Sequence, residues 1–127
     1  MRLLGIDYGS KRVGIAIGDT DHGMAFPKVV FKNDQDLVKN ILKIIKEESI
    51  EGVVMGESKN FKNEDNKIMK EILGFKKVLE ENSSLEVTLH PEFMTSAEAV
   101  HLQGENEMLD ASAAALILKS YLNKTIN

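Results

Sequence analysis

The first quarter of the chain carries apolar residues in the patterns of β-strands. Residues 2–7 are a short apolar run, and residues 12–18 (RVGIAIG) place an apolar side chain at every second position. The residues between these segments, YGSK, are typical of a turn. Residues 24–32 predict a third strand, in which Pro27 indicates an edge position or a bend. Three consecutive strands with short connections predict an antiparallel meander.

The pattern then changes to helical spacing. Asn33 or Asp34 can cap a helix whose apolar residues recur every three or four positions as far as Ser49. Residues 52–56 (GVVMG) form an unbroken apolar run, which is typical of a central strand buried on both faces. A helix between two such strands predicts a parallel crossover.

The remaining sequence predicts three helices and a further strand. An amphipathic helix covers residues 68–81, and residues 85–90 form a fifth strand that stops at Pro91. A short helix follows at residues 95–102, and an alanine-rich closing helix covers residues 109–122.

The order βββαβαβαα predicts an α/β fold with a mixed five-stranded sheet. The meander supplies the antiparallel strands, the later strands are parallel, and helices cover both faces. A length of 127 residues suits a single domain over 1–127.

The amino-acid composition limits the kinds of metal and catalytic site that the chain can form. The chain contains no cysteine, which excludes disulfides and thiolate sites and leaves carboxylates and three histidines as strong metal ligands. No apolar run approaches the roughly 18 residues of a membrane span, and the first residues do not resemble a signal peptide. We therefore expect a cytoplasmic protein that does not enter a membrane.

The charge pattern bears on nucleic-acid binding. A net charge of -4 counts against it, because phosphate neutralisation favours a basic surface. Clustered basic residues can nevertheless form a local basic groove. Two such clusters occur, one in the first 32 residues and one in a later loop: Lys11, Arg12, Lys28 and Lys32, then Lys59, Lys62 and Lys67.

The segment GIDYGSKRVG is the strongest candidate for a functional site. Asp7 ends the first predicted strand and can hold Mg²⁺ or Mn²⁺. Gly9 lets the backbone approach a ligand, and Ser10 or Lys11 can donate to an anion. The alternative is an ordinary hairpin with a solvated aspartate.

Four segments resemble the YqgF family, whose members are predicted to be nucleases similar to Holliday junction resolvases or active on pre-16S rRNA. GIDYGSKRVGIAIGD resembles the family's opening, and VVMGESKNFKNEDN is similar to its GLP loop. PEFMTSAEA is similar to DERLTTxxA, and LDASAAALILKSYL to IDSxAAxxILxxYL. The resemblance spans almost the whole chain and implies a ribonuclease H-like fold.

The resemblance also implies a catalytic, metal-binding set of three carboxylates, Asp7, Glu92 and Asp110. Carboxylates suit two Mg²⁺ or Mn²⁺ ions, one to activate water and one to stabilise the leaving oxygen of a phosphodiester. Taken singly, Glu92 could be a turn residue and Asp110 could simply cap the last helix.

Two departures from the family pattern affect this site. DER reads PEF here, so that Pro91 and Phe93 replace an Asp and an Arg. Arg12 is then the only arginine expected near the site, where its guanidinium suits a phosphate; the alternative is a solvent-facing strand residue. The GLP loop reads Gly-Glu-Ser, which makes Glu57 a candidate supplementary metal ligand or, alternatively, an ordinary surface glutamate.

A polar loop and the histidines complete the candidates. Lys59 and Asn60 could follow a phosphate backbone, with Phe61 either stacking on a base or packing in the core. The three histidines share no ligand spacing, which argues against a zinc site.

We therefore expect a Mg²⁺- or Mn²⁺-dependent endonuclease that acts at the 5′ end of pre-16S rRNA, with Ser10, Lys11, Arg12, Lys59 and Asn60 contacting nucleic acid. Three alternatives stay open: a resolvase of branched DNA, a nucleic-acid-binding or scaffold protein with impaired catalysis, and a nucleotide-phosphate corner like that of actin-like folds. A homodimer is compatible with each.

Overall fold

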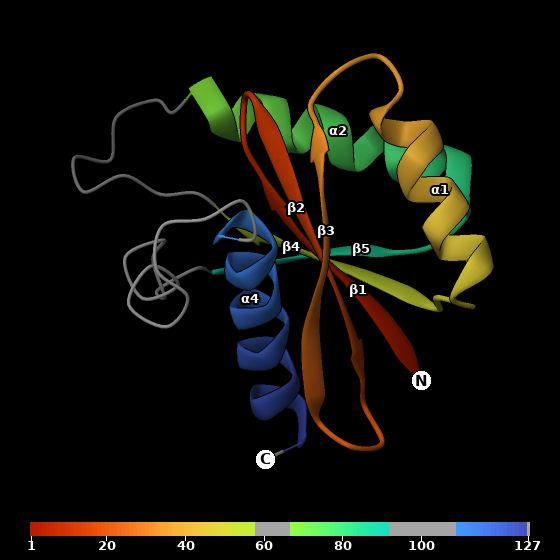
Figure 1. Cartoon of the computed structure of the whole chain (residues 1–127), viewed down its shortest axis with the longest axis vertical. Helices are drawn as coiled ribbons and strands as arrows, with labels where there is room; N and C mark the ends of the chain where they lie inside the picture. Colours follow the sequence, from red (N-terminus) through yellow and green to blue (C-terminus); the bar gives the residue numbers. More distant parts are fainter. Residues whose placement is uncertain (58–66, 92–108, 127) are drawn as a thin grey trace.

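A five-stranded mixed sheet in the order β3-β2-β1-β4-β5 runs through the molecule (Figure 1). The computed structural model describes residues 1–57, 67–91 and 109–126. The strands are β1 (Arg2–Tyr8), β2 (Arg12–Asp19), β3 (Met24–Lys32), β4 (Gly52–Glu57) and β5 (Val87–Pro91). β1, β2 and β3 pair antiparallel, whereas β4 and β5 run parallel to β1. The predicted meander followed by parallel strands is confirmed.

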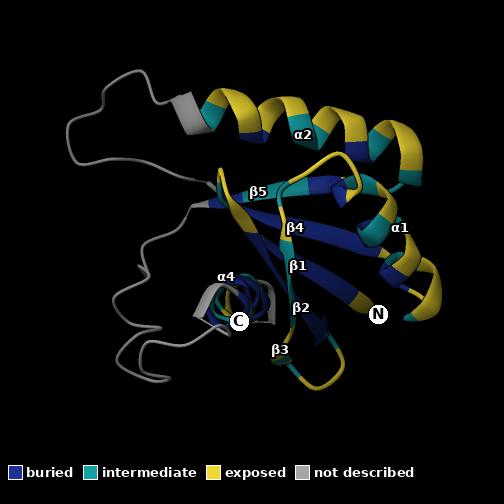
Figure 2. Ribbon diagram, turned by 45° about the horizontal axis from the view of Figure 1, so that its top comes forward, coloured by how far each residue is buried: buried dark blue, intermediate teal, exposed yellow. Residues whose placement is uncertain are grey.

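Helices cover both faces of the sheet, as predicted (Figure 2). α1 (Leu37–Glu47) and α2 (Lys67–Ser83) lie on one face, and α4 (Leu109–Ile126) lies on the other. The helix expected at residues 95–102 lies outside the described residues. None of the helices in the described part of the chain is long and apolar enough to cross a membrane.

The alternation of side chains along β1 decides which residues face which helices. Leu4 and Ile6 are fully buried in the core beneath α1 and α2. Leu3 belongs instead to the smaller core beneath α4. Because successive side chains of a strand point to opposite faces, Gly5 and Asp7 share the α4 face with Leu3.

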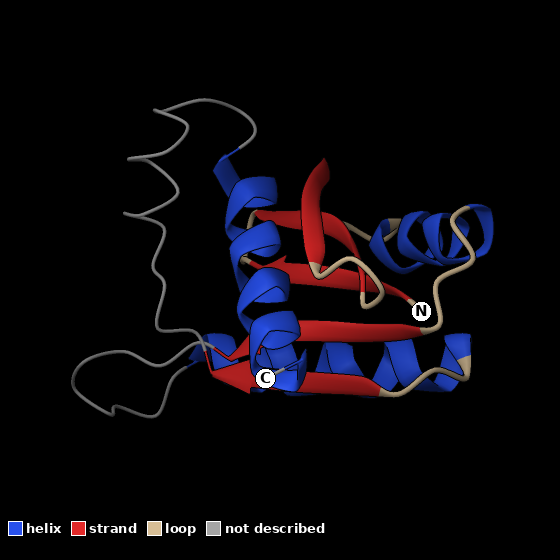
Figure 3. Ribbon diagram, turned by 90° about the horizontal axis from the view of Figure 1, so that it is seen from below, coloured by secondary structure: helices blue, strands red, loops and turns tan. Residues whose placement is uncertain are grey.

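Two glycines allow α4 to lie close against the sheet, across the strands (Figure 3). A Cβ atom on Gly5 would lie 2.9 Å from the carbonyl oxygen of Ala114, and one on Gly18 would lie 2.8 Å from Cδ2 of Leu118. The alanines of α4 and the glycines of β1 and β2 therefore form a close contact that larger side chains would prevent.

The edge position predicted for Pro27 is confirmed, since β3 is the outermost strand beside β2. Pro27 lies opposite Ala16, and the register shifts between Ile15 and Ala16, so that Lys28 has no partner in the ladder. A shift of this kind is typical of a β-bulge and increases the local twist.

The helix cap predicted at Asn33 or Asp34 is wrong. The residue preceding α1 is Asp36, and its side chain makes no capping hydrogen bond. Oδ1 of Asp34 accepts a hydrogen bond from the backbone N–H of Asp36 at 2.9 Å, which forms a turn before the helix. Asn33 has a different partner, described below.

The fifth strand begins at Val87, two residues later than predicted. Ser84 has a left-handed backbone (φ 61°), and the backbone N–H of Leu85 donates to Oγ of Ser83 at 3.1 Å. These residues form the connection between α2 and β5, which delays the start of the ladder.

Candidate active site

Asp7 is half-buried near the end of β1, on the face that α4 covers. Its partner in the β1–β2 ladder is Gly14, so no side chain stands beside it on β2. The placement of Asp7 at a strand end is as predicted, and the alternation along β1 adds the face to which it belongs.

Asp110 lies in the first turn of α4. Ala114, one turn later in the same helix, has its carbonyl oxygen against Gly5, two residues before Asp7 on β1. One helical turn advances about 6 Å over four residues, and two strand residues advance about 7 Å. The start of α4 and the end of β1 are therefore linked by the contact between Ala114 and Gly5.

Glu57 is the last residue of β4 and pairs with Pro91, the last residue of β5. Ile6 of β1 pairs with Met55 of β4, so the ends of all three parallel strands reach the same edge of the sheet. Such an edge is where ligands usually bind in open α/β sheets.

Several predicted site residues lie outside the described residues. Glu92 follows Pro91 directly and is one of them, and Lys59 and Asn60 are others. Within the described ranges, no three or more histidine, aspartate or glutamate residues form a group that could hold a metal ion. Of the four predicted metal ligands, Asp7 is the one whose side chain the structure describes. Its carboxylate is of the type that Mg²⁺ and Mn²⁺ prefer.

Asn33, one of the two predicted helix caps, instead holds the turn between β1 and β2. Nδ2 of Asn33 donates to the carbonyl oxygen of Gly9 at 2.7 Å, and the backbone N–H of Asn33 donates to the carbonyl oxygen of Lys11 at 2.9 Å. A Cβ atom on Gly9 would lie 2.6 Å from the carbonyl oxygen of Arg12, which only glycine allows. The turn is thus tied to the end of β3.

The predicted phosphate-contacting residues Ser10, Lys11 and Arg12 are exposed on this turn and at the start of β2. They lie at the same end of the β1–β2 hairpin as Asp7, because Tyr8 pairs with Val13. The structure therefore places the predicted phosphate-contacting residues at the same end of the hairpin as the predicted metal ligand Asp7.

The predicted basic cluster of the first 32 residues is only partly correct. Lys32 lies opposite Arg12 in the β2–β3 ladder. Nζ of Lys28, in contrast, lies 3.7 Å from Oε2 of Glu48, whose Oε1 accepts a hydrogen bond from Arg2 at 2.8 Å. Lys28 therefore belongs to a separate ion-pair group.

His90, near the end of β5, is buried beneath α4. Its Nε2 lies 3.0 Å from Oγ of Ser120, and its ring packs edge-on against Tyr121 with centroids 5.9 Å apart. Burial lowers the pKa of His90 below its ordinary value of 6.5, and the charge of Lys124 lowers it further. His22 is remote from this position, exposed, and 3.2 Å from Asp19.

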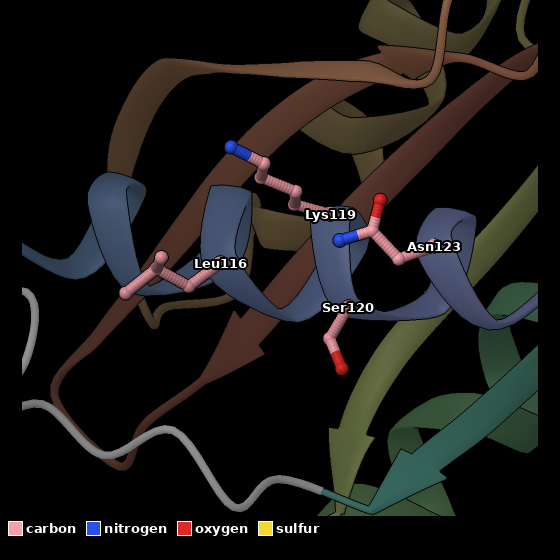
Figure 4. Close-up of a pocket in the computed structure, with 4 residues that line it drawn as sticks. All are labelled: Leu116, Lys119, Ser120 and Asn123. Atoms are coloured by element: carbon pink, nitrogen blue, oxygen red, sulfur yellow. The ribbon is translucent and has the colours of Figure 1, made fainter.

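A hollow of about 300 Å³ lies on α4 beside Ser120 (Figure 4). Its described lining is Leu116, Lys119, Ser120 and Asn123. Ser120 thus reaches both this hollow and the buried His90. Sequence reasoning did not single out Ser120, because its contact with His90 spans two elements that are distant in the chain.

Comparisons with known proteins agree with the fold and the sequence resemblance. The family model described as "RuvX: Holliday junction resolvase" matches residues 1–124. A protein of Nitratidesulfovibrio vulgaris named "Putative pre-16S rRNA nuclease" is 34% identical, with 97% of this chain and 94% of that protein covered. A protein of the same name from Pediococcus pentosaceus is 30% identical, with coverages of 97% and 93%.

Solved structures show the same architecture. Thermus thermophilus RuvC, in complex with a Holliday junction substrate, superposes with a TM-score of 0.66 at 15% identity, covering 100% of this chain and 97% of RuvC. The fowlpox virus resolvase, in complex with Holliday junction DNA, gives a TM-score of 0.62 at 16% identity, with both chains covered completely. The predicted ribonuclease H-like fold is confirmed.

Proposed function

Because the chain belongs to the RuvX (YqgF) family of Holliday junction resolvases, we propose that it is a divalent-metal-dependent endonuclease that processes the 5′ end of pre-16S rRNA. The substrate is suggested by the curated relatives that share about a third of its residues. The observation that carries the proposal is the position of Asp7, at the end of β1 on the face covered by α4.

Asp7, Glu92 and Asp110 would hold the metal, with Glu57 as a further ligand or as a partner that orients one. The family motifs support the choice of these residues. Their backbone positions support it as well, because Asp7 and Glu57 lie at strand ends and Asp110 lies at the start of α4. Mg²⁺ or Mn²⁺ would lower the pKa of a bound water and neutralise charge on the phosphodiester.

The exposed turn after β1 would position the substrate. Lys11 and Arg12 bind phosphates through charge-assisted hydrogen bonds, and the Arg12 guanidinium can contact two phosphate oxygens at once. Ser10 donates a further hydrogen bond, and Lys59 and Asn60 extend the contact along the backbone. The tie between Asn33 and Gly9 keeps the turn in one conformation as substrate binds.

The test compares cleavage of 5′-extended 16S rRNA, unstructured single-stranded RNA and a four-way DNA junction, with Mg²⁺, Mn²⁺ or EDTA. We expect cleavage of the rRNA with either metal and none in EDTA. Asp7→Asn, Glu92→Gln and Asp110→Asn should each lower the rate at least about a hundredfold, because each removes a charge from the metal site.

Asp21→Asn is the matched control, since Asp21 is an exposed carboxylate at the opposite end of the β1–β2 hairpin. Its cleavage rate should equal that of the unmodified protein. Metal-dependent cleavage that survives both Asp7→Asn and Asp110→Asn would refute the assignment of the site.

The family description favours a second candidate, resolution of Holliday junctions. Preferential cleavage of the four-way junction would establish this activity in place of rRNA processing. If the protein binds these substrates but cleaves none of them with either metal, the Pro91 and Phe93 departures have left a binding protein with this fold.

A further inference from the structure

A basic hollow lies where β2 and β3 meet, at the end of the hairpin that carries Asp7. Arg12 and Lys32 are direct partners in the β2–β3 ladder. With Val30 and Phe31 they line a space of about 270 Å³. No family motif contains Lys32, which the charge pattern placed only in a cluster of basic residues.

The ladder places this hollow relative to Asp7. Asp7, Gly14 and Val30 form one row across three neighbouring strands, and Arg12 and Lys32 form the next row outward on the same face. Strand spacings of about 4.8 Å and 3.4 Å per residue put the Cα atoms of Asp7 and Lys32 about 12 Å apart. A polynucleotide whose scissile phosphate lies at Asp7 can therefore reach the hollow with a neighbouring phosphate.

The charge of Lys32 is not neutralised by the described residues. Lys32 is exposed and forms no ion pair with any of them, whereas Lys28, Lys43 and Lys76 each pair with a glutamate. The nearest acid along the chain, Asp34, uses Oδ1 to accept the backbone N–H of Asp36 at 2.9 Å. Lys32 thus presents its ammonium group beside the Arg12 guanidinium in a protein whose net charge is -4.

The backbone around the hollow is fixed. Asn33, the next residue after Lys32, is bonded through its side chain to Gly9 and through its backbone N–H to Lys11. Two like charges that face each other across a ladder repel, and an anionic ligand bound between them would relieve this repulsion. A phosphodiester shares one negative charge between two non-bridging oxygens, so an arginine and a lysine can bind it together.

We propose that Lys32 and Arg12 form a phosphate subsite, which binds a backbone phosphate of the substrate next to the one held at Asp7. The proposal rests on the proposed nuclease function, and it adds Lys32 as a residue that positions the substrate. The ligand is the phosphodiester backbone of a nucleic acid rather than a free phosphate, because the row that contains the hollow continues from Asp7 along one face.

The test measures binding of a fluorescently labelled single-stranded RNA by polarisation, in EDTA, over a range of salt concentrations. Chelation prevents cleavage, so that binding is measured alone. Lys32→Gln should weaken binding about five- to eightfold at 0.1 M salt, and should reduce the slope of log K against log salt by about 0.7 to 0.9, the value for one phosphate contact. Arg12→Gln should give a similar loss.

Lys77→Gln is the control, because Lys77 is an exposed lysine on α2, on the opposite face of the sheet. It removes the same charge and should leave the slope unchanged. In cleavage assays, Lys32→Gln should raise KM with kcat unchanged, since the subsite binds substrate without touching the reacting atoms.

Three results would overturn the subsite. The first is a salt slope for Lys32→Gln equal to that of the unmodified protein. The second is a salt slope that falls equally for Lys32→Gln and Lys77→Gln, which would indicate a general charge effect. The third is binding of inorganic phosphate at millimolar concentration that Lys32→Gln abolishes, together with no effect of Lys32→Gln on RNA binding; the site would then take free phosphate.

The binding and cleavage results separate this proposal from the proposed function. An altered slope in a protein that cleaves no substrate supports the subsite and refutes the nuclease. Cleavage that depends on Asp7, together with an unaltered slope in Lys32→Gln, refutes the subsite alone.

Discussion

The side chain of Asn33 is hydrogen bonded to the carbonyl oxygen of Gly9 at 2.7 Å, joining the end of β3 to the turn that follows β1. The two residues are 24 positions apart, yet the contact holds the turn next to Asp7. The backbone of this turn therefore depends on a residue outside the β1–β2 hairpin.

Asn33→Ala should lower the free energy of unfolding by about 1 kcal/mol, because it leaves a partly buried carbonyl oxygen without its partner. It should also raise KM for nucleic acid, since the turn that carries Lys11 and Arg12 loses its support. Urea denaturation and steady-state cleavage measure the two effects.

Asn82→Ala provides the comparison for Asn33→Ala. Nδ2 of Asn82 donates to the carbonyl oxygen of Val78 at 2.8 Å, on the exposed surface of α2. Its removal should cost less stability and leave KM unchanged. Equal KM values for both alanine variants would contradict the role of Asn33.

Gly5→Ala should destabilise the protein by about 1 to 3 kcal/mol, because the new methyl group would lie 2.9 Å from the carbonyl oxygen of Ala114 and force α4 from the sheet. Cleavage should fall as well, since the same contact relates Asp110 to Asp7. The measurements are urea denaturation and the rate at saturating substrate.

Gly74→Ala is the matched substitution. A Cβ atom on Gly74 meets nothing within 4 Å, and the residue lies inside α2. Alanine should therefore stabilise the helix by about 0.5 to 1 kcal/mol without changing the cleavage rate. A loss of stability at both glycines would show that the close approach of α4 is not the cause.

Leu118→Ala should cost about 2 to 5 kcal/mol, because Leu118 is fully buried and its removal leaves a cavity between α4 and the sheet. Leu116, two residues earlier, is half-buried and lines the hollow on the outer side of the helix (Figure 4). Leu116→Ala should cost much less. Similar losses by thermal or urea denaturation for both variants would contradict this packing.

Local patterns were sufficient to predict the five strands and the antiparallel meander followed by parallel strands. Alternation along residues 12–18 predicts β2, and Pro27 predicts an edge strand, because both are consequences of backbone geometry over a few residues. The resemblance to a family predicted the ribonuclease H-like fold, which the solved structures confirm. The metal-binding role that the same resemblance implies for Asp7 stays a prediction.

Contacts between segments that are distant in the chain could not be predicted from local sequence patterns. Asparagine is a common helix-capping residue, and only the folded chain shows that the partner of Asn33 is the carbonyl oxygen of Gly9. In the sequence, Lys28 and Lys32 are two lysines of the same predicted strand. In the structure, Lys28 lies at the β-bulge and pairs with Glu48, whereas Lys32 lies opposite Arg12. The tertiary partner decides the role of a polar residue at each of these positions.

The last prediction concerns Glu80, which links α2 to the start of β5. Oε2 of Glu80 accepts the backbone N–H of Val87 at 3.0 Å, and Oε1 lies 3.1 Å from Nζ of Lys76. The hydrogen bond from Val87, followed by the one from Lys76, lowers the pKa of Glu80 below its ordinary value of 4.5.

The direction of this shift fixes its effect on stability. The folded state favours the charged carboxylate, so the contribution of Glu80 is fully present above pH 4.5 and is lost as the pH falls through the lower pKa of the folded state. Glu80→Gln should therefore lower the melting temperature at pH 7 and flatten its decline in acid. Glu81→Gln, which changes an exposed neighbour, should retain the melting temperature at pH 7 and the acid decline of the unmodified protein. Parallel melting curves for Glu80→Gln and the unmodified protein from pH 7 to pH 3 would show that the hydrogen bond to Val87 does not couple the carboxylate to folding.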